Sequence, residues 1–404
     1  MLTQYYPPEI GAPQNRLSHL ASQFVRRGHR VTVLTAMPSY PLGRIHDGYG
    51  GLFRSENRDS VQVLRSFVYP TQKAKMLPRL MNYVSFVCSS LLAGAAALPK
   101  LDFLFTESPP LFLGISGALL SWAKGARYIF NVSDLWPESA VHVGLIQREG
   151  LGFRLAGRLE ADLYRRAWLV TGQARTILSD ISQRFPHVPT FHLSNGVDTT
   201  LFNSALPDRS LERRGKFTIV YAGLHGIAQG LDQLVEAACL LRDSTVHFIF
   251  VGDGPTKRTI AELITQRRVS NIELHPPVPH TAVAAVLLAA DAVVVPLRSA
   301  IPGAVPSKVY EAMAAGKPVL FIGDGEGAQI VTAADAGIVV RPGDVHRIAA
   351  ALRELAANAN LSALLGRNGR AGAVKYDRAR IAERFITYLE EELAGRPHAQ
   401  TAVL

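Results

Sequence analysis

The chain has 404 residues, of which 48% are hydrophobic and 19% charged. This composition excludes a disordered protein, and the length exceeds what one ordinary core accommodates, so two α/β domains are expected. A formal net charge of +10 predicts attraction to polyanions: nucleic acid, anionic lipid or phosphorylated substrates. The basic residues are scattered and no nucleic-acid motif accompanies them, which disfavours nucleic-acid binding.

The first residues of the chain, Met1–Gln4, are typical of the last residues of a β-strand whose earlier residues are not part of this sequence. They are followed at once by two tyrosines and two prolines, with no basic segment and no cleavage site, so a signal peptide is not predicted. We expect the natural start of this strand to lie several residues upstream.

The two cysteines, Cys88 and Cys239, lie far apart in apolar stretches. This spacing disfavours a disulfide framework or a metal cluster and fits a reducing compartment. Each cysteine is predicted to be a small buried side chain.

The first half of the chain alternates short apolar strands with helices, a pattern that predicts parallel sheets of βαβ units. The expected strands are 29–35, 61–67, 102–106, 127–132, 168–171 and 191–193. The expected helices are 13–27, 81–98, 111–123 and 150–167. Helix 13–27 ends at Gly28, as helices commonly do.

The second half of the chain repeats this alternation of strands and helices. The expected strands are 217–221, 246–251, 272–274, 292–296 and 318–322, and the expected helices are 231–241, 256–268, 281–289 and 306–315. A last helix is expected at 380–393. The pattern predicts two facing, doubly wound, Rossmann-like domains that bind ligands at the carboxyl ends of strands, inside a deep cleft. We expect one domain from residues 1–195, completed by 380–404, and the other from 196–379.

The helix predicted at 81–98 has 18 residues without a charge, the lower limit for spanning a bilayer. Its serine, asparagine, glycine and alanine content favours a buried or interfacial helix, with a membrane span as the alternative. Lys73, Lys75 and Arg79 lie just before it and suit a membrane surface.

The segment 306–318 (PSKVYEAMAAGKP) is predicted to be a helix that Pro306 opens and Gly316 closes. It follows a strand, 292–296, and a loop that contains glycine, 301–305. Free N–H groups at such a helix N-terminus favour a phosphate by about 0.3–1 kcal/mol for the dipole alone.

Lys308 adds a full positive charge to this helix start, beside Ser307. Glu311 lies one turn after Ser307 on the same face, where its carboxylate suits the hydroxyls of a ribose. The local chemistry leaves two interpretations open: an anion site, or a surface helix with an incidental lysine and glutamate.

Asp134, Trp136 and Glu138 directly follow strand 127–132, where an α/β sheet places its site. An aromatic ring flanked by two carboxylates suits a sugar; the alternative is a core Trp136 and a helix-capping Asp134. Gly11 allows backbone N–H groups to approach a ligand, or marks an ordinary strand-to-helix turn.

Several short segments occur in a recognisable order: NGVD at 195–198, VGDGP at 251–255, DAVVVP at 291–296 and the 308–318 block. Together they resemble the retaining glycosyltransferases of family 4, which have the GT-B fold. The segments YPPEIGA (6–12), 27–34, PSYP (38–41) and DLWPES (134–139) resemble the bacterial subgroup that builds surface polysaccharides on lipid carriers. The resemblance covers nearly the whole chain.

The resemblance assigns Glu311 to the second glutamate of the family's E-x7-E motif, which binds the ribose of the donor nucleotide. The first glutamate is absent, because Gly303 stands there; backbone N–H groups of Gly303 and Ala304 are expected to substitute. Gly223 and Gly252 are expected at the donor site. The chain also departs from the family at Ser133, where many members carry a histidine.

The family's loop after the first strand of the second domain commonly carries an arginine and a lysine. Here it reads GLHGIAQG, with His225 and Gln229 near those places, and neither is a reliable cation at pH 7. Lys308 and Arg298 are therefore expected to supply the charge opposite the diphosphate. Asp134, Glu311 and Gly11 are the expected catalytic residues.

The resemblance implies transfer of a sugar from a nucleotide sugar to a lipid-linked saccharide, with retention and with the leaving phosphate accepting the proton. The chain has no Asp-x-Asp, so neither a metal nor another cofactor is expected. The expected location is cytoplasmic, with peripheral contact to the inner membrane face. The alternatives are a nucleotide-sugar 2-epimerase of the same fold and a non-catalytic protein that binds anionic membranes or nucleic acid.

Overall fold

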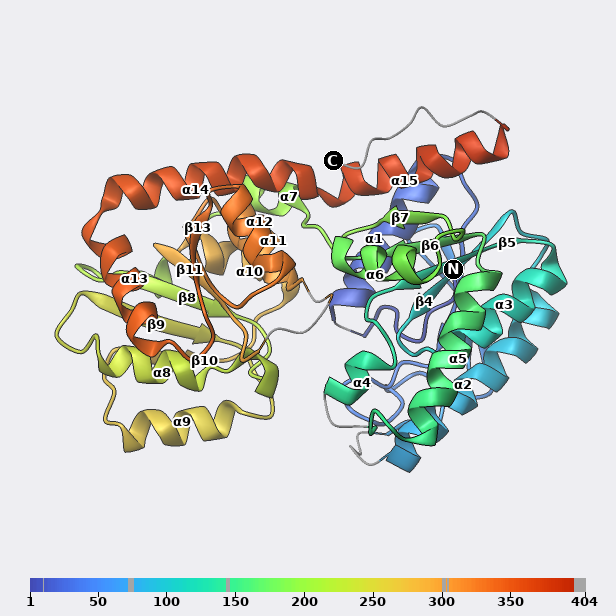
Figure 1. Ribbon diagram of the computed structural model, residues 1–404, viewed down its shortest axis with the longest axis horizontal. Helices are drawn as coiled ribbons and strands as arrows, with labels where there is room; N and C mark the ends of the chain where they lie inside the picture. The colour runs from blue at the N-terminus through green and yellow to red at the C-terminus, as the bar shows by residue number, and fades with distance from the viewer. Residues whose placement is uncertain (10, 72–75, 143–145, 300–302, 304, 396–404) are drawn as a thin grey trace. The chain divides into compact units, whose positions relative to one another are not determined.

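The computed structural model describes residues 1–9, 11–71, 76–142, 146–299, 303 and 305–395. The chain forms two compact units (Figure 1). Unit 1 comprises Met1–Asn195, Ile301–Gly303 and Arg378–Leu404. Unit 2 comprises Gly196–Ala300 and Ala304–Asp377.

The strands of unit 1 form two neighbouring groups, ordered β1-β3-β2 and β4-β5-β6-β7. Leu2 joins the groups through isolated parallel bridges to Leu34 and Thr106, so the segment Met1–Gln4, which was predicted to be extended, pairs with both groups without forming a strand of its own. The strands are β1 (Thr32–Ala36), β2 (Phe53–Arg58), β3 (Val61–Ser66), β4 (Phe103–Ser108), β5 (Arg127–Val132), β6 (Leu169–Gly172) and β7 (Thr190–His192).

Strand β2 was not predicted from the sequence, and its pairing with β3 is the one antiparallel pairing among the described strands. Its residues, FRSENR, are polar and mostly exposed, so they lack the apolar pattern of a buried strand. A two-residue turn joins β2 to β3, and both of its residues, Asp59 and Ser60, have positive φ. Such turns match the twist of a hairpin.

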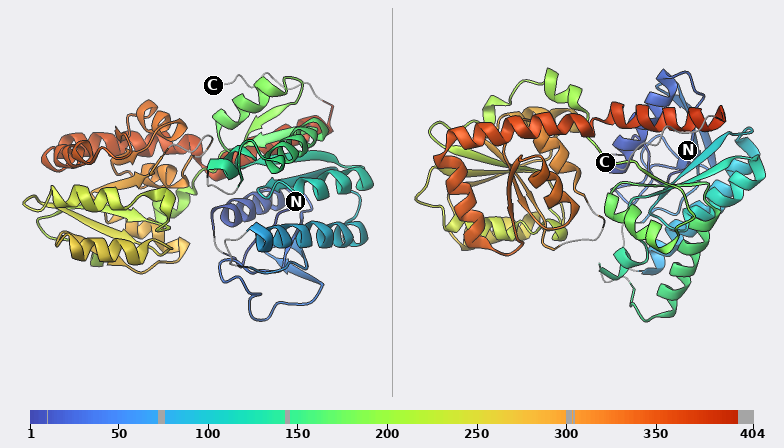
Figure 2. Two further views of the ribbon diagram at one scale, coloured as in Figure 1. Left: turned by 60° about the horizontal axis from the view of Figure 1, so that its bottom comes forward. Right: turned by 45° about the horizontal axis from the view of Figure 1, so that its top comes forward.

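Helices cover both faces of the unit 1 sheet, and alternate strand residues point to opposite faces. Val33 and Phe105 pack with α1 (Ala12–Arg26) and α15 (Arg378–Leu393). Leu34 and Leu104 pack in a second cluster with α2 (Met76–Ala97) and α3 (Leu113–Lys124). Figure 2 shows α2 and α3 side by side in both views. The remaining helices are α4 (Glu138–His142), α5 (Leu151–Arg166) and α6 (Arg175–Arg184).

Unit 2 has a six-stranded, fully parallel sheet in the order β10-β9-β8-β11-β12-β13. Its strands are β8 (Phe217–Ala222), β9 (Val246–Val251), β10 (Ile272–His275), β11 (Ala292–Pro296), β12 (Val319–Ile322) and β13 (Gly337–Val340). Strands β9, β11 and β12 are buried along their whole length, which explains their continuous apolar runs. The strand order reverses between β8 and β11, where doubly wound sheets bind ligands.

The helices of unit 2 alternate with its strands. They are α7 (Thr199–Ser204), α8 (Asp232–Cys239), α9 (Lys257–Gln266), α10 (His280–Leu288), α11 (Ser307–Ala314), α12 (Glu326–Ala333), α13 (Val345–Ala357) and α14 (Ala359–Ala373). Short 3-10 turns lie at Arg209–Leu211, Ile227–Gln229 and Val374–Tyr376. Two α/β units on parallel sheets confirm the predicted fold class.

The prediction that both cysteines are buried was wrong. Cys88 is exposed and Cys239 is half-buried, and both are free thiols. Cys88 lies on α2, on the side of the helix that faces away from the sheet, so the apolar character of its neighbours in sequence did not indicate burial.

Candidate functional site

Two glycines follow directly on neighbouring strands of unit 2, Gly223 after β8 and Gly252 after β9. Their φ angles, 148° and 151°, are ones that side chains rarely adopt. A Cβ on Gly252 would lie 1.9 Å from the carbonyl oxygen of Gly223. Only glycine allows these two turns to pack so closely, so both predicted residues shape the same end of the sheet.

Lys308, the second residue of α11, lies against these turns. A Cβ on Gly223 would meet Lys308 Cε at 2.1 Å and Nζ at 2.7 Å, and Nζ lies 5.9 Å from the centroid of the Tyr221 ring. Burial lowers the pKa of Lys308, while the nearby Glu311 opposes the shift. A desolvated ammonium at the start of a helix attracts an anion, because the helix dipole acts in the same direction.

His225 lies in the loop after β8 and is fully buried. Its N–H donates to the carbonyl of Asp253, and its own carbonyl accepts from the N–H and hydroxyl of Thr256. Neither ring nitrogen has a hydrogen-bond partner within the described part of the chain. Burial, reinforced by Lys257, lowers the pKa of His225, so the imidazole is neutral at pH 7.

The other predicted donor residues are less closely grouped. The guanidinium of Arg298 lies 2.5 Å from Asp232 Oδ1 and also donates to the carbonyl of Ile227, so its charge is already partly compensated. Ser307 begins α11 and Glu311 follows one turn later; both are half-buried. Gly303 has φ 79°, and Ala304 lies outside the described residues.

A buried ion pair lies at the carboxyl edge of the unit 1 sheet. Arg16, on α1, places Nη2 2.5 Å from Oε1 of Glu107, on β4, and the two side chains are only 7% and 3% exposed. Ser133, directly after β5, donates its hydroxyl to the same Glu107 oxygen at 2.5 Å. Arg16 Nη2 also donates to Ser133 Oγ at 3.2 Å.

Three further side chains complete this network. Asn131 on β5 donates from Nδ2 to Glu107 Oε2 at 2.7 Å, and Thr171 on β6 donates to Asn131 Oδ1 at 2.6 Å. Arg16 Nη1 donates to Asn195 Oδ1 at 3.2 Å. The network therefore connects α1 to the ends of three adjacent strands.

Asp134 directly follows Ser133, and the charges of this network affect its pKa. Burial and the negative charge of Glu107 raise its pKa to about 6, although Arg16 opposes the shift. Trp136 lies with its ring 6.4 Å from that of Phe112, and Glu138 begins α4. Gly11 caps the N-terminus of α1 in an extended conformation, where a Cβ would meet the Gln14 side chain at 2.5 Å.

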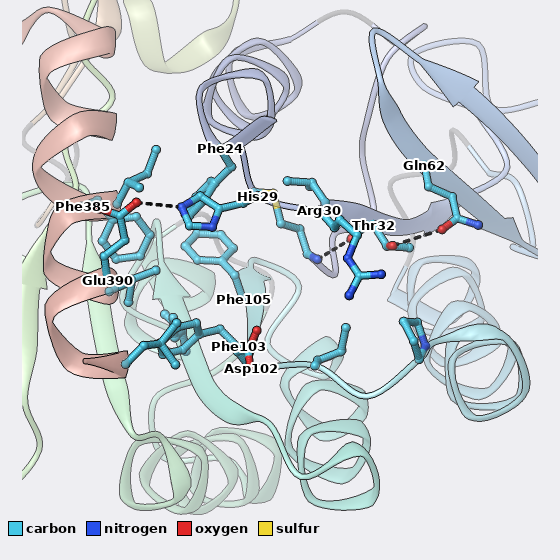
Figure 3. A pocket seen from close by; sticks show the side chains of 18 of the residues that line it. Phe24, His29, Arg30, Thr32, Gln62, Asp102, Phe103, Phe105, Phe385 and Glu390 are labelled. Carbon is cyan, nitrogen blue, oxygen red and sulfur yellow. Dashed lines mark hydrogen bonds and ion pairs between the residues drawn. The ribbon is translucent and has the colours of Figure 1, made fainter. Parts of the chain in front are cut away.

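Unit 1 also has a cavity of about 500 Å³, and none of these residues lines it. Figure 3 shows side chains that line the cavity. It is lined by the first residues of two strands, Thr32 and Phe103, and by Phe24, Phe105 and Phe385. Because Asp134 follows the opposite, carboxyl ends of the strands, we do not assign this cavity to the candidate site. Within the described residues, no group of three or more His, Cys, Asp or Glu side chains is placed to hold a metal ion.

Two family models together match most of the chain. The "Glycosyl transferase 4-like domain" matches residues 11–196, and "Glycosyl transferases group 1" matches residues 203–372. The second range contains the Gly223, Gly252 and Lys308 cluster. The chain belongs to the family 4 glycosyltransferases.

Curated relatives of this glycosyltransferase come from bacteria and an archaeon. WcaI, the glycosyl transferase of Escherichia coli K12 named for colanic acid biosynthesis, is 26% identical over 86% of this chain and 89% of its own length. WbjE, a glycosyltransferase of Pseudomonas aeruginosa, is 26% identical over 57% of this chain and 59% of its own.

Solved structures show that the glycosyltransferase has the GT-B fold. Sucrose-phosphate synthase from Thermosynechococcus elongatus superposes with a TM-score of 0.76 at 17% identity, covering 98% of both chains. HepE from Anabaena, solved with UDP-glucose, gives a TM-score of 0.71 at 16% identity, covering 98% of this chain and 99% of its own.

Asp134→Asn is expected to stabilise the glycosyltransferase at alkaline pH. The folded state keeps the Asp134 proton up to about pH 6, whereas the unfolded chain loses it near 3.8. The free energy of unfolding of the wild type therefore falls as pH rises from 4 to 6, and Asn avoids this loss. The gain at pH 8 is at most about 3 kcal/mol.

Urea unfolding at several pH values measures this difference, which should shrink as the pH falls through 6. Asp47→Asn, at a highly exposed carboxylate, is the matched control and should show no such dependence. An Asp134→Asn gain that is equal at pH 5 and pH 8 would contradict the raised pKa.

The sequence did not point to Arg16, Glu107 or Asn131. Arg16 lies little more than one turn beyond Gly11 in the helix predicted at 13–27, and Glu107 lies one residue beyond the predicted end of strand 102–106. A search for polar residues at the carboxyl ends of all predicted strands would have found Glu107. Asn131 falls inside a strand, where no local signal separates it from a structural residue.

Proposed function

We propose that this glycosyltransferase moves a sugar from a nucleoside-diphosphate sugar to a lipid-linked saccharide in the synthesis of a bacterial surface polysaccharide. Unit 2 binds the donor and unit 1 the acceptor. The observation that carries the donor assignment is the position of Lys308, at the start of α11 and against the glycine turns at Gly223 and Gly252.

The relatives support the nature of the donor and of the product. HepE has been solved with UDP and with UDP-glucose, and WcaI is named for colanic acid biosynthesis. The structure titled WaaG, a glycosyltransferase of lipopolysaccharide biosynthesis, has a TM-score of 0.66 at 18% identity.

In the proposed reaction, the bond between the sugar's anomeric carbon and the diphosphate breaks, and a bond to an acceptor hydroxyl oxygen forms on the same face. Because the new bond forms on the face that the diphosphate leaves, the product retains the anomeric configuration. The hydroxyl proton passes to the leaving phosphate. Lys308 and the N-terminus of α11 stabilise the charge that develops on the leaving diphosphate, without a metal.

Each donor contact has a proposed role. Glu311 binds the ribose hydroxyls, and Ser307 and the backbone near Gly252 contact the phosphates. The backbone N–H of Gly303 contacts the transferred sugar, in place of the glutamate that the family usually has there; the other residue expected in this role, Ala304, lies outside the described residues. The guanidinium of Arg298 is paired with Asp232, so Arg298 stabilises the diphosphate only if the donor replaces Asp232 as its partner.

On the acceptor side, Asp134 and the backbone at Gly11 position the hydroxyl that attacks. The enzyme is proposed to work in the cytoplasm, in peripheral contact with the inner face of the membrane, where a lipid-linked acceptor is presented.

Thermal unfolding with UDP, GDP and dTDP, and with their sugars, tests the donor site. A ligand at about 100 times its dissociation constant stabilises by about 2.7 kcal/mol, which raises Tm by about 5 °C or more in a domain of this size. One nucleotide class is expected to give this shift with the wild type and not with Lys308→Met. No shift with any nucleotide would overturn the donor assignment.

Radiolabelled transfer from the selected donor to lipid extracts of polysaccharide-producing bacteria tests the acceptor. The proposed function predicts a product that requires the extract and that keeps the anomeric configuration of the donor by NMR. Isomerised sugar formed from the donor alone would instead identify a nucleotide-sugar 2-epimerase.

A further inference from the structure

Helix α2 has an apolar stripe on the face that is turned away from the sheet of unit 1. Its members lie three or four residues apart, so they share one side of the helix. They are Leu77, Leu80, Met81, Val84, Cys88 and Leu92, all of them exposed. Leu77 is 67% exposed and Leu92 is 76% exposed. Single exposed apolar residues are ordinary, but a continuous row over four turns marks an interaction surface.

The opposite face of α2 is fixed to the domain. Asn82 accepts a hydrogen bond from Gln4 at 2.6 Å, Ser90 bonds to Ser116 at 3.1 Å, and Phe86 is fully buried. Gly94 lets Leu120 of α3 approach, since a Cβ there would lie 2.6 Å from its Cδ1. The length and composition of Leu77–Ala97 would allow it to cross a membrane. A membrane-spanning α2 would, however, lose these contacts with the rest of unit 1.

Exposed aromatic side chains lie on the segments next to α2. Phe67 and Tyr69, after β3, are both exposed, and hydrogen bonds tie their backbone to α2 through Ser85 and Ser89. Trp122, on the adjacent α3, is 85% exposed. Aromatic side chains with polar atoms are favoured where a hydrocarbon region meets water. We define the α2 stripe with Phe67, Tyr69 and Trp122 as the apolar patch.

The charged residues next to α2 in the sequence have one sign. No Asp or Glu occurs between Asp59 and Asp102, whereas Lys73, Lys75, Arg79 and Lys100 do; Lys73 and Lys75 lie outside the described residues. Arg65, the fifth cation of this stretch, is buried and paired with Glu56, so it does not contribute to the surface charge. On α3, Lys124 donates to the carbonyl of Ala95 at the end of α2. Contact of the patch with a second copy of itself would bring cations together without acidic partners. An anionic surface complements both the charge and the apolar row.

We propose that the apolar patch is the surface by which this enzyme docks flat onto an anionic lipid bilayer, with α2 lying in the interface. The proposal rests on the proposed function, because a lipid-linked acceptor is presented at such a surface. The outer face of α2 enters the headgroup boundary, the aromatic rings flank it, and Arg79 and Lys124 are the described cations that contact lipid phosphates.

Flotation of the full chain with lipid vesicles, without any nucleotide sugar, tests the docking separately from transfer. Binding is expected with phosphatidylcholine vesicles that contain 30% phosphatidylglycerol, and it should weaken with added salt and with pure phosphatidylcholine. The variant Leu77→Gln, Val84→Gln, Leu92→Gln should lower the apparent partition coefficient at least tenfold. All three side chains are exposed, so the variant should keep the wild-type Tm.

The matched control is Leu206→Gln, Leu240→Gln, Leu364→Gln, which removes three exposed leucines of unit 2. It should bind vesicles like the wild type. Equal binding by the two triple variants would overturn the proposal, as would a concentration-dependent dimer that only the α2 variant abolishes. The donor-induced thermal shift should be the same in all three proteins, so a failed donor site and a failed docking surface are distinguishable.

Brominated lipids locate the contact. Their quenching of tryptophan fluorescence should fall sharply in Trp122→Phe, while Trp136 and Trp168, which are less exposed, contribute little. Unchanged quenching in Trp122→Phe would place the lipid contact elsewhere and overturn the proposal.

Discussion

Lys308→Met is expected to lower kcat/KM for the nucleotide-sugar donor by about 100-fold, or about 2.7 kcal/mol. Methionine keeps the unbranched shape that packs against Gly223 and Tyr221 but removes the positive charge. The loss should be large because burial lowers the pKa of Lys308: a partly desolvated ammonium acts strongly on a diphosphate. Steady-state kinetics at subsaturating donor measure the effect.

Lys317→Met is the matched control for Lys308→Met. Burial lowers the pKa of Lys317 too, but Lys317 precedes β12, at the amino end of the strand. Its replacement should leave kcat/KM nearly unchanged, and Lys308→Arg should keep part of the activity. Equal losses in both methionine variants would mean that the effect is structural and would contradict the diphosphate assignment.

Arg16→Met is expected to destabilise unit 1 by about 3–5 kcal/mol, because it leaves the carboxylate of Glu107 buried without its cation. Ser133 and Asn131 still donate to Glu107, but two neutral donors do not replace a guanidinium at 2.5 Å. Urea unfolding monitored by circular dichroism measures the change. The same substitution should raise the pKa of Asp134 further, since Arg16 is the positive charge that opposes its shift.

The double variant Arg16→Met, Glu107→Gln should recover much of this loss, because a buried glutamine costs less than an unpaired carboxylate. Arg258→Met breaks a highly exposed ion pair with Glu262 and should change stability little. Additive losses in the double variant would show that Arg16 and Glu107 do not act as a pair.

Much of the fold was accessible from the sequence, because apolar periodicity is a local property. Strands β5, β9 and β11 lie where the pattern predicted them, and α11 begins one residue after Pro306. Strand β2 lacks such a pattern, because it is an edge strand whose residues are polar and mostly exposed. Between residue 325 and the helix predicted at 380–393 the sequence analysis predicts no element, whereas the structure has α12, β13, α13 and α14 there.

The candidate site was accessible only in part. Lys308, Ser307 and Glu311 could be placed together because they belong to one helix, and Asp134 because it follows a strand. The pairing of Arg298 with Asp232 was not foreseeable, since 66 positions separate them in the chain. The burial of His225 was equally hidden, because it depends on the loop that follows β9.

The sequence by itself determined the alternation of strands and helices, the family and the helix that carries Lys308. Tertiary structure alone decided which distant residues meet: Lys308 beside Gly223 and Gly252, and Arg16 beside Glu107 and Ser133. The reason is physical. Hydrophobic pattern specifies each element from its neighbours in the chain, whereas the order of strands within the sheet decides which carboxyl ends lie next to each other.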